Sequence, residues 1–263
     1  MRTRLFSIVL LLLSIIFLTT ACSTTNKVVS SSDNDKQANV SGSGGNTATK
    51  NTVSEQVHTI KIGSAFYEVS YPPGKERYFI AISTPKGIVW NPVPSMEGQY
   101  LQVHPTSPFT LYLSPSTVTK LETNHAQKIL VLPLKMDTPI GKMNVFLGSL
   151  FSTNDWVVYC ISLYSPGMNQ PYLSKLYAFN LTNRENLFVS DLLSTGGYQF
   201  ALGMEGNQLL FDQEVPNSQG DFTHTISIFD LNSGKKSQVA VNKIKIQNGD
   251  YVYKGSVYKM IWF

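Results

Sequence analysis

Apolar residues in this chain occur in short runs bounded by Gly, Pro, Asn and Asp, without the three- and four-residue spacing of an amphipathic helix. The runs are rich in Val, Ile, Tyr and Phe, which favours β-strands. They cover residues 78–82, 111–113, 129–132, 145–151, 176–181, 209–211 and 226–231. Asn248-Gly249 predicts a two-residue hairpin turn. We therefore predict an all-β domain.

The first residues follow another pattern. Arg2 and Arg4 precede Leu5 to Leu18, a stretch of fourteen residues without a charge. A membrane-spanning helix needs about 20 apolar residues, so this stretch is short for one. A positive start followed by a short apolar region is typical of an export signal.

The segment Leu18-Thr19-Thr20-Ala21-Cys22 follows the apolar stretch and resembles the lipobox of bacterial lipoproteins. Thr19 departs from that pattern, which usually has Leu, Val or Ile there. The resemblance implies that residues 1–21 are a signal peptide and that Cys22 is acylated, palmitate being a typical chain. The protein would then be held on the cell membrane, facing outside the cytoplasm, because two acyl chains give stable anchoring. The alternatives are an uncleaved anchor and a plain secretory signal.

Residues 22–55 are polar, rich in Ser, Gly and Asn, and contain no aromatic residue. Such a composition cannot bury enough apolar surface to order itself, so we expect a disordered linker. The remaining residues, 56–263, are numerous enough for one hydrophobic core and form the expected β-rich domain.

An internal repeat with a period near fifty residues is visible in the domain. Residues 155–159 align with 207–211, and residues 176–185 align with 226–235; a weaker copy lies at 129–134. The second aligned element, which ends Phe-Asn-Leu or Phe-Asp-Leu before a turn, resembles a strand of TolB-like and quinoprotein-like β-propellers. The resemblance implies a propeller of about four blades, or a partial one. The alternative is a β-sandwich. In the propeller a strand near the C-terminus could pair with the N-terminal strands.

Residues that could support catalysis or hold a metal ion are scattered. The histidines are His58, His104, His125 and His224, and none has a second His or Cys at metal-ligand spacing. A Ser-x-x-Lys sequence at residues 83–86 is similar to that of penicillin-binding enzymes, but Pro85 and strand-like flanks replace the expected helix. We expect no cofactor, although a Ser-His-Asp set could still assemble in space.

Two loops offer candidate binding residues. In the segment 212–221, oxygen ligands for calcium are available on Asp212, Glu214, Asn217 and Asp221. The neutral loop 165–172 carries Met168 and Tyr172, residue types favoured at recognition surfaces. The alternatives are a solvated loop for the first and packing in the core or a turn for the second.

The two cysteines, Cys22 and Cys160, do not suggest a disulfide framework. Cys160 lies in the apolar run 156–161, so we expect it to be buried. The net charge of +4 is too small to indicate nucleic-acid binding.

These observations favour a membrane-anchored, non-catalytic binding module. Its partner, besides the membrane, would be a protein, a peptide or a cell-wall component. The alternative is an extracytoplasmic hydrolase or lyase whose site combines scattered His, Asp and Ser residues.

Overall fold

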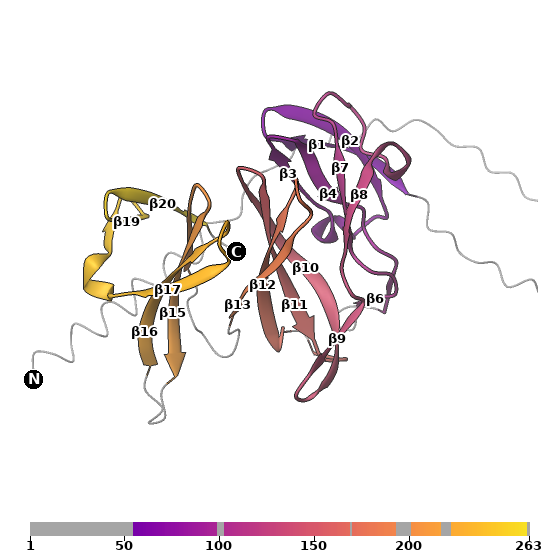
Figure 1. The fold of residues 1–263 in the computed structure, drawn as a ribbon. Helices are drawn as coiled ribbons and strands as arrows, with labels where there is room; N and C mark the ends of the chain where they lie inside the picture. The colour runs from indigo at the N-terminus through magenta and orange to yellow at the C-terminus, as the bar shows by residue number, and fades with distance from the viewer. Residues whose placement is uncertain (1–54, 99–102, 169, 193–200, 217–221, 262–263) are drawn as a thin grey trace, which may run out of the picture. The chain divides into compact units, whose positions relative to one another are not determined.

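The computed structural model describes residues 55–98, 103–168, 170–192, 201–216 and 222–261. These residues belong to one compact unit, 51–263 (Figure 1). Cys22 and the expected signal and linker segments lie outside the described residues. None of the helices within the described ranges has the length and hydropathy required to cross a membrane.

The described chain consists of β-strands, with short 3-10 helices between them (Figure 1). The all-β prediction is therefore confirmed. The 3-10 helices are η2 (Glu76–Tyr78), η4 (Thr123–His125) and η5 (Val241–Lys243).

The strands form sheets whose ladders are antiparallel. A two-stranded sheet contains β1 (Gln56–Ile62) and β2 (Ala65–Tyr71). A four-stranded sheet contains, in spatial order, β3 (Ile80–Thr84), β4 (Gly87–Asn91), β7 (Thr110–Ser114) and β8 (Gln127–Val131). The short strands β5 (Met96–Glu97) and β6 (His104–Pro105) pair with each other.

The two larger sheets contain the repeat. The five-stranded sheet has the order β13 (Asn186–Leu192), β12 (Leu173–Asn180), β11 (Trp156–Tyr164), β10 (Gly141–Thr153) and β9 (Lys135–Thr138). The seven-stranded sheet has the order β17 (Lys235–Val239), β16 (Phe222–Asp230), β15 (Gln208–Pro216), β14 (Ala201–Glu205), β20 (Ser256–Ile261), β19 (Asp250–Tyr253) and β18 (Lys245–Gln247).

The repeat appears in the structure as two similar antiparallel units, β10–β13 and β14–β17. In the first, the Leu181 N–H donates to the Asp155 carbonyl over 2.7 Å; in the second, the Leu231 N–H donates to the Asn207 carbonyl over 2.8 Å. The turn that follows each contact places a residue in the left-handed region, with φ of 64° at Arg184. The equivalent φ is 63° at Gly234. The sequence alignment therefore identifies structurally equivalent turns.

Strand β11 is buried on both faces because sheets cover it from either side. Val157 and Tyr159 belong to a core cluster shared with the four-stranded sheet. Val158 and Cys160 belong to a second cluster shared with β15 and β16. This explains the unbroken apolar run at 156–161, since a strand with two covered faces needs no polar alternation. Cys160 is buried as expected, and burial raises the pKa of its thiol to about 12.

The C-terminal strand β20 pairs with β14 and β19, not with the N-terminal strands, so that expectation was wrong. β14 is paired with β15 on one edge and accepts β20 on the other. Gly203 of β14 permits this close approach, because an added Cβ there would lie 2.8 Å from the Tyr258 Cβ. The Asn248-Gly249 turn is confirmed between β18 and β19, with φ of 53° and 85°.

Candidate functional site

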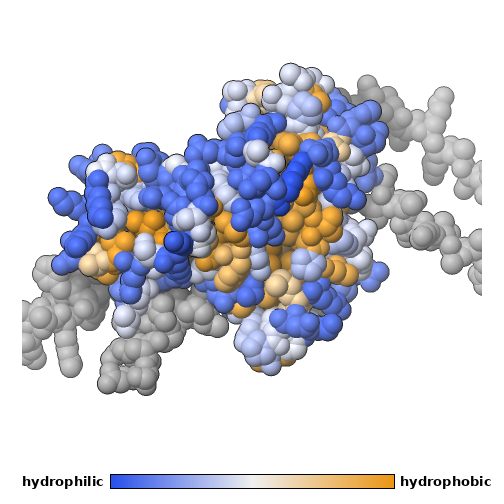
Figure 2. All heavy atoms as spheres, in the orientation of Figure 1, coloured by the Kyte–Doolittle hydropathy of each residue, from blue (hydrophilic) through white to orange (hydrophobic). Residues whose placement is uncertain are grey.

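A cleft with a volume of about 690 Å³ opens beside β10 and β11. This volume lies within the range of about 300–1,000 Å³ that is usual for small-molecule sites. The lining also includes Arg77 and Tyr78 of η2 and residues 165–168 of the loop after β11. Figure 2 shows apolar side chains gathered at the surface where Figure 1 draws β8 and β10, among largely polar surroundings.

The strand register explains which side chains form the floor of the cleft. Asn144 of β10 lies opposite Tyr164 of β11, and Phe146 lies opposite Ser162. Residues directly opposite in an antiparallel pair share a face, as do residues two apart on one strand. These four side chains therefore form a continuous patch, and Lys135 of β9, opposite Asn144, extends it.

Aromatic rings surround Phe146. The Phe146 and Tyr164 ring centroids are 4.9 Å apart in an edge-to-face arrangement. The Tyr78 ring lies 6.2 Å from Phe146, and the Phe109 ring lies 6.1 Å away. Such contacts hold the rings in place, so the apolar part of the cleft is built before a ligand arrives.

The charge of the lining is one-sided. Arg77 and Lys135 line the cleft, and no carboxylate of the described residues does. The Arg77 guanidinium donates to the Tyr78 hydroxyl over 2.6 Å and lies 4.7 Å from the centroid of that ring. Neither Arg77 nor Lys135 has an ion pair with a described acid. Their positive charge is therefore available to a ligand.

Asn144 is the most informative residue of the floor. It is 7% exposed, lines the cleft, and has no side-chain hydrogen bond to a described residue. Buried amides in native proteins nearly always have partners, in protein or in solvent. The Asn144 amide therefore presents unused hydrogen-bonding capacity to whatever occupies the cleft. The neighbouring Tyr164 remains a neutral phenol, because burial raises the pKa of its hydroxyl despite the nearby Arg77.

The two predicted recognition residues have different environments. Met168 lines the cleft and is 58% exposed. Tyr172 is partly buried against the first core cluster, and its N–H donates to the Leu163 carbonyl over 2.8 Å. Thus Met168 is placed to meet a ligand, whereas Tyr172 packs beside the core and does not line the cleft.

The predicted calcium ligands fall only partly within the described residues. Asp212 lies on β15, where one carboxylate oxygen contacts His224 Nε2 and the other accepts a hydrogen bond of 2.7 Å from the Tyr251 hydroxyl. Glu214 lies opposite His224 in the register, and its side chain is outside the described set. Asn217 and Asp221 are also outside it. Among the His, Cys, Asp and Glu side chains that are described, no group of three is placed to hold a metal, and the calcium site stays a prediction.

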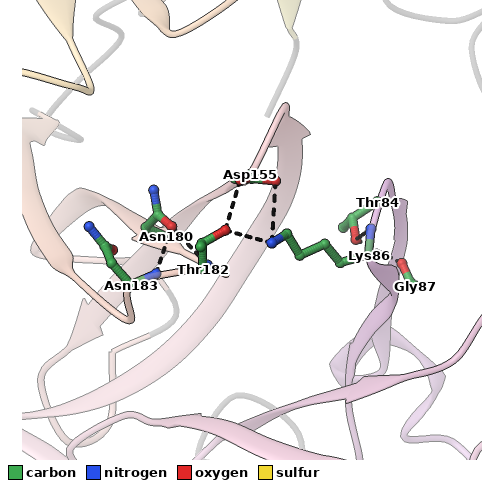
Figure 3. Close-up of polar contacts among 7 residues, drawn as sticks. All are labelled: Thr84, Lys86, Gly87, Asp155, Asn180, Thr182 and Asn183. Carbon is green, nitrogen blue, oxygen red and sulfur yellow. Dashed lines mark hydrogen bonds and ion pairs between the residues drawn. The ribbon is translucent and has the colours of Figure 1, made fainter.

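The Ser-x-x-Lys sequence lies at the β3–β4 turn (Figure 3). Lys86 Nζ donates to Thr182 Oγ1 over 2.5 Å and lies 3.7 Å from an Asp155 carboxylate oxygen. Thr182 in turn donates to Asp155 over 2.8 Å. Lys86 is thus engaged in a polar cluster that joins the turns of two sheets, and this contact accounts for its position.

The cleft residues Asn144, Phe146, Tyr164, Arg77 and Lys135 were not singled out by the sequence. A signal was present for the first three, since register pairing of the runs at 143–151 and 156–164 would have placed them on one face. Arg77 and Lys135 come from other segments, and nothing local indicated that they meet there.

Comparison of the chain with protein-family models and with curated proteins finds no match. The site must therefore be interpreted from its own geometry.

Proposed function

We propose that the chain is an exported lipoprotein, held outside the cytoplasm by a lipid on Cys22, whose β-domain binds a ligand in the cleft without catalysing a reaction. The observation that carries the binding role is the cleft itself. It combines the Asn144 amide, which has no side-chain hydrogen bond to a described residue, with aromatic rings in mutual contact and with two cations, Arg77 and Lys135, that form no ion pair with a described acid. Concave sites with a few convergent polar groups are typical of ligand binding.

The lining argues for binding over chemistry. A hydrolase needs a nucleophile and a base in hydrogen-bond contact. The Ser162 hydroxyl in the cleft is instead engaged with the Ser174 hydroxyl at 3.0 Å. No described carboxylate lines the cleft to serve as a base or to orient a histidine. The residues present are suited to holding a polar, ring-bearing ligand.

The test places a photo-reactive side chain at Met168 in intact cells, with Phe66 as the matched position. Both residues are highly exposed and apolar, at 58% and 65%, but Phe66 lies on the β1–β2 hairpin and does not line the cleft. We expect a defined cross-linked species from position 168 and none from position 66. Equal labelling at both positions would contradict a ligand site in the cleft.

The anchor has its own test. The full chain with Cys22→Ala should leave the membrane fraction and lose incorporation of labelled palmitate, because the thiol is the proposed acylation site. Retention of both properties by the variant would contradict lipidation at Cys22.

A hydrolase or lyase remains a second candidate because of the Asp212–His224 contact. Paired Asp and His side chains occur where a histidine serves as a base. Here Tyr251 also donates to Asp212, which gives the acid a structural role as well. If the ligand recovered through Met168 is converted by the protein, and His224→Gln stops the conversion, this candidate replaces the binding role.

We also propose that the sheets are propeller-like blades. Supporting this, β10–β13 and β14–β17 repeat the same turns, and the five-stranded sheet packs against a sheet on either side. An experimental structure with β10 and β14 facing a common axis would support blades, whereas two sheets facing each other without an axis would support the β-sandwich.

A further inference from the structure

We infer that the ligand of the cleft is an anionic glycan, a saccharide that carries carboxylate or phosphate groups. This inference rests on the proposed binding role of the cleft and specifies the chemistry of its ligand.

The anionic character follows from the charges of the lining. Arg77 and Lys135 lie on separate elements, η2 and β9, and both border the same cleft without a described carboxylate partner. An anion placed between these elements would gain charge-assisted hydrogen bonds, and Arg in particular matches the geometry of carboxylate and phosphate oxygens. A cationic ligand would be repelled by both of these side chains.

The saccharide character follows from the floor. Aromatic and hydrogen-bonding side chains alternate across it, with Tyr164 opposite Asn144 and Ser162 opposite Phe146. A sugar ring has C–H groups on its faces and hydroxyls on its edges. The C–H faces match the negative faces of aromatic rings, and the hydroxyls match the amide and hydroxyl groups beside them.

The unpartnered Asn144 amide strengthens this match. An amide offers two donors and an acceptor, so it can bond a sugar hydroxyl in both directions. Asn144 is 7% exposed and lines the cleft, so its amide, which has no hydrogen bond to a described residue, can bond a ligand there. The amide is also neutral, which leaves the positive charge of the cleft uncancelled.

A peptide is the less favoured occupant because most strand edges at the floor are already paired. β11 lies between β10 and β12, and β10 is paired with β9 as far as Asn144. An added peptide strand could therefore join only the edge of β10 beyond Asn144. An acidic peptide held only by its side chains is an outcome that the experiment must distinguish.

The experiment measures binding of four probes to the full chain by titration calorimetry. The probes are an oligogalacturonate, a phosphorylated mannan oligosaccharide, the same mannan without phosphate, and polyglutamate. We expect one or both anionic glycans to bind, with affinity that falls as salt is raised. Binding of only the neutral mannan, only polyglutamate, or none of the probes would overturn the inference. Comparison of the oligogalacturonate with the phosphorylated mannan shows whether the cleft binds a carboxylate or a phosphate group.

Variants link the binding to the cleft. Arg77→Gln with Lys135→Gln should weaken the anionic glycan about tenfold or more, as expected for loss of charged hydrogen bonds. Lys128→Gln removes an exposed charge from β8, outside the cleft lining, and should leave affinity unchanged. Equal losses in both forms would indicate nonspecific attraction and overturn the inference.

Asn144→Asp gives a sharper result, since it keeps the shape and adds a negative charge. The anionic glycan should be lost while the melting transition persists, and an unchanged affinity would overturn the inference. If the variant does not fold, Asn144→Ser replaces it and should weaken binding severalfold. Cross-linking at Met168 tests the binding role separately from the ligand class. If position 168 is still labelled but no anionic glycan binds, the binding role is retained and only the proposed ligand class is refuted.

Discussion

The two ends of the β10–β11 pair differ in how their polar side chains are satisfied. At the turn end, Lys86, Asp155 and Thr182 contact one another across two sheets (Figure 3). At the cleft end, Asn144 has no side-chain hydrogen bond and Lys135 no ion pair to a described residue. Polar groups that satisfy each other stabilise the fold, whereas unsatisfied ones remain available to bind. Between the ends lies the apolar core around β11.

The largest expected effect concerns the buried apolar core around β11, which separates the two ends. The buried Cys160 thiol, with its pKa raised to about 12, should react with a small alkylating reagent at pH 8 about a thousandfold more slowly than in the unfolded chain. The Cys22→Ala form leaves Cys160 as the sole thiol. Similar rates in native and urea-unfolded protein would show that the centre is open to solvent.

Gly87→Ala should destabilise the turn end. An added Cβ would overlap the Ser114 carbonyl oxygen, and φ at Gly87 is 133°. We expect a loss of about 1–3 kcal/mol in the free energy of unfolding measured in urea, or more where the backbone must move. Gly141→Ala is the control, since its φ is 117° but nothing lies within 4 Å of the new Cβ. A larger loss for Gly141→Ala would mean that the close approach at Ser114 is unimportant.

The Lys86–Asp155 ion pair offers a smaller effect that sharpens the comparison. Both side chains are partly exposed, so a double-mutant cycle of Lys86→Gln and Asp155→Asn should give a coupling of about 0.2–1 kcal/mol. High salt should reduce it. At the cleft end, Lys135→Gln should leave the free energy of unfolding within about 0.5 kcal/mol of the parent. A destabilisation by Lys135→Gln equal to that of Lys86→Gln would remove the distinction between the ends.

The smallest effect concerns acid stability at the repeated turn. The hydrogen bond that the Ser233 N–H donates to the Asp230 carboxylate is the largest cause that lowers the pKa of Asp230, and further hydrogen bonds to the carboxylate add to it. The folded pKa is below the unfolded value of about 3.9, so the stabilisation is present above that pH and is lost as pH falls through the folded pKa. Asp230→Asn should flatten the loss of stability with acid, measured by urea midpoints between pH 5 and pH 2.

The preceding repeat provides the reverse experiment. Asn180 accepts the equivalent N–H bonds from Thr182 and Asn183 without a charge. Asn180→Asp should therefore add acid dependence where Asp230→Asn removes it. The same slope in both variants would indicate that the two turns are not electrostatically equivalent.

Local pattern was sufficient for much of the fold. The short Val-, Ile- and Tyr-rich runs are strands, Cys160 is buried, and Asn248-Gly249 forms its turn. The repeat at 155–185 and 207–235 also corresponds to equivalent turns. These features depend on neighbours in sequence, on side-chain alternation and on backbone preference, which are all properties of short segments of the chain.

Tertiary structure decided the rest, because it depends on segments that are distant in sequence. The pairing of β20 with β14 required a free edge and the small Gly203. The cleft required η2, β9, β10 and β11 to meet, so neither Arg77 nor Lys135 was distinguishable beforehand from an ordinary turn or strand residue. The sequence by itself determined strands, turns and a repeated unit; only the packing of those strands decided which polar groups are left without partners and can therefore bind.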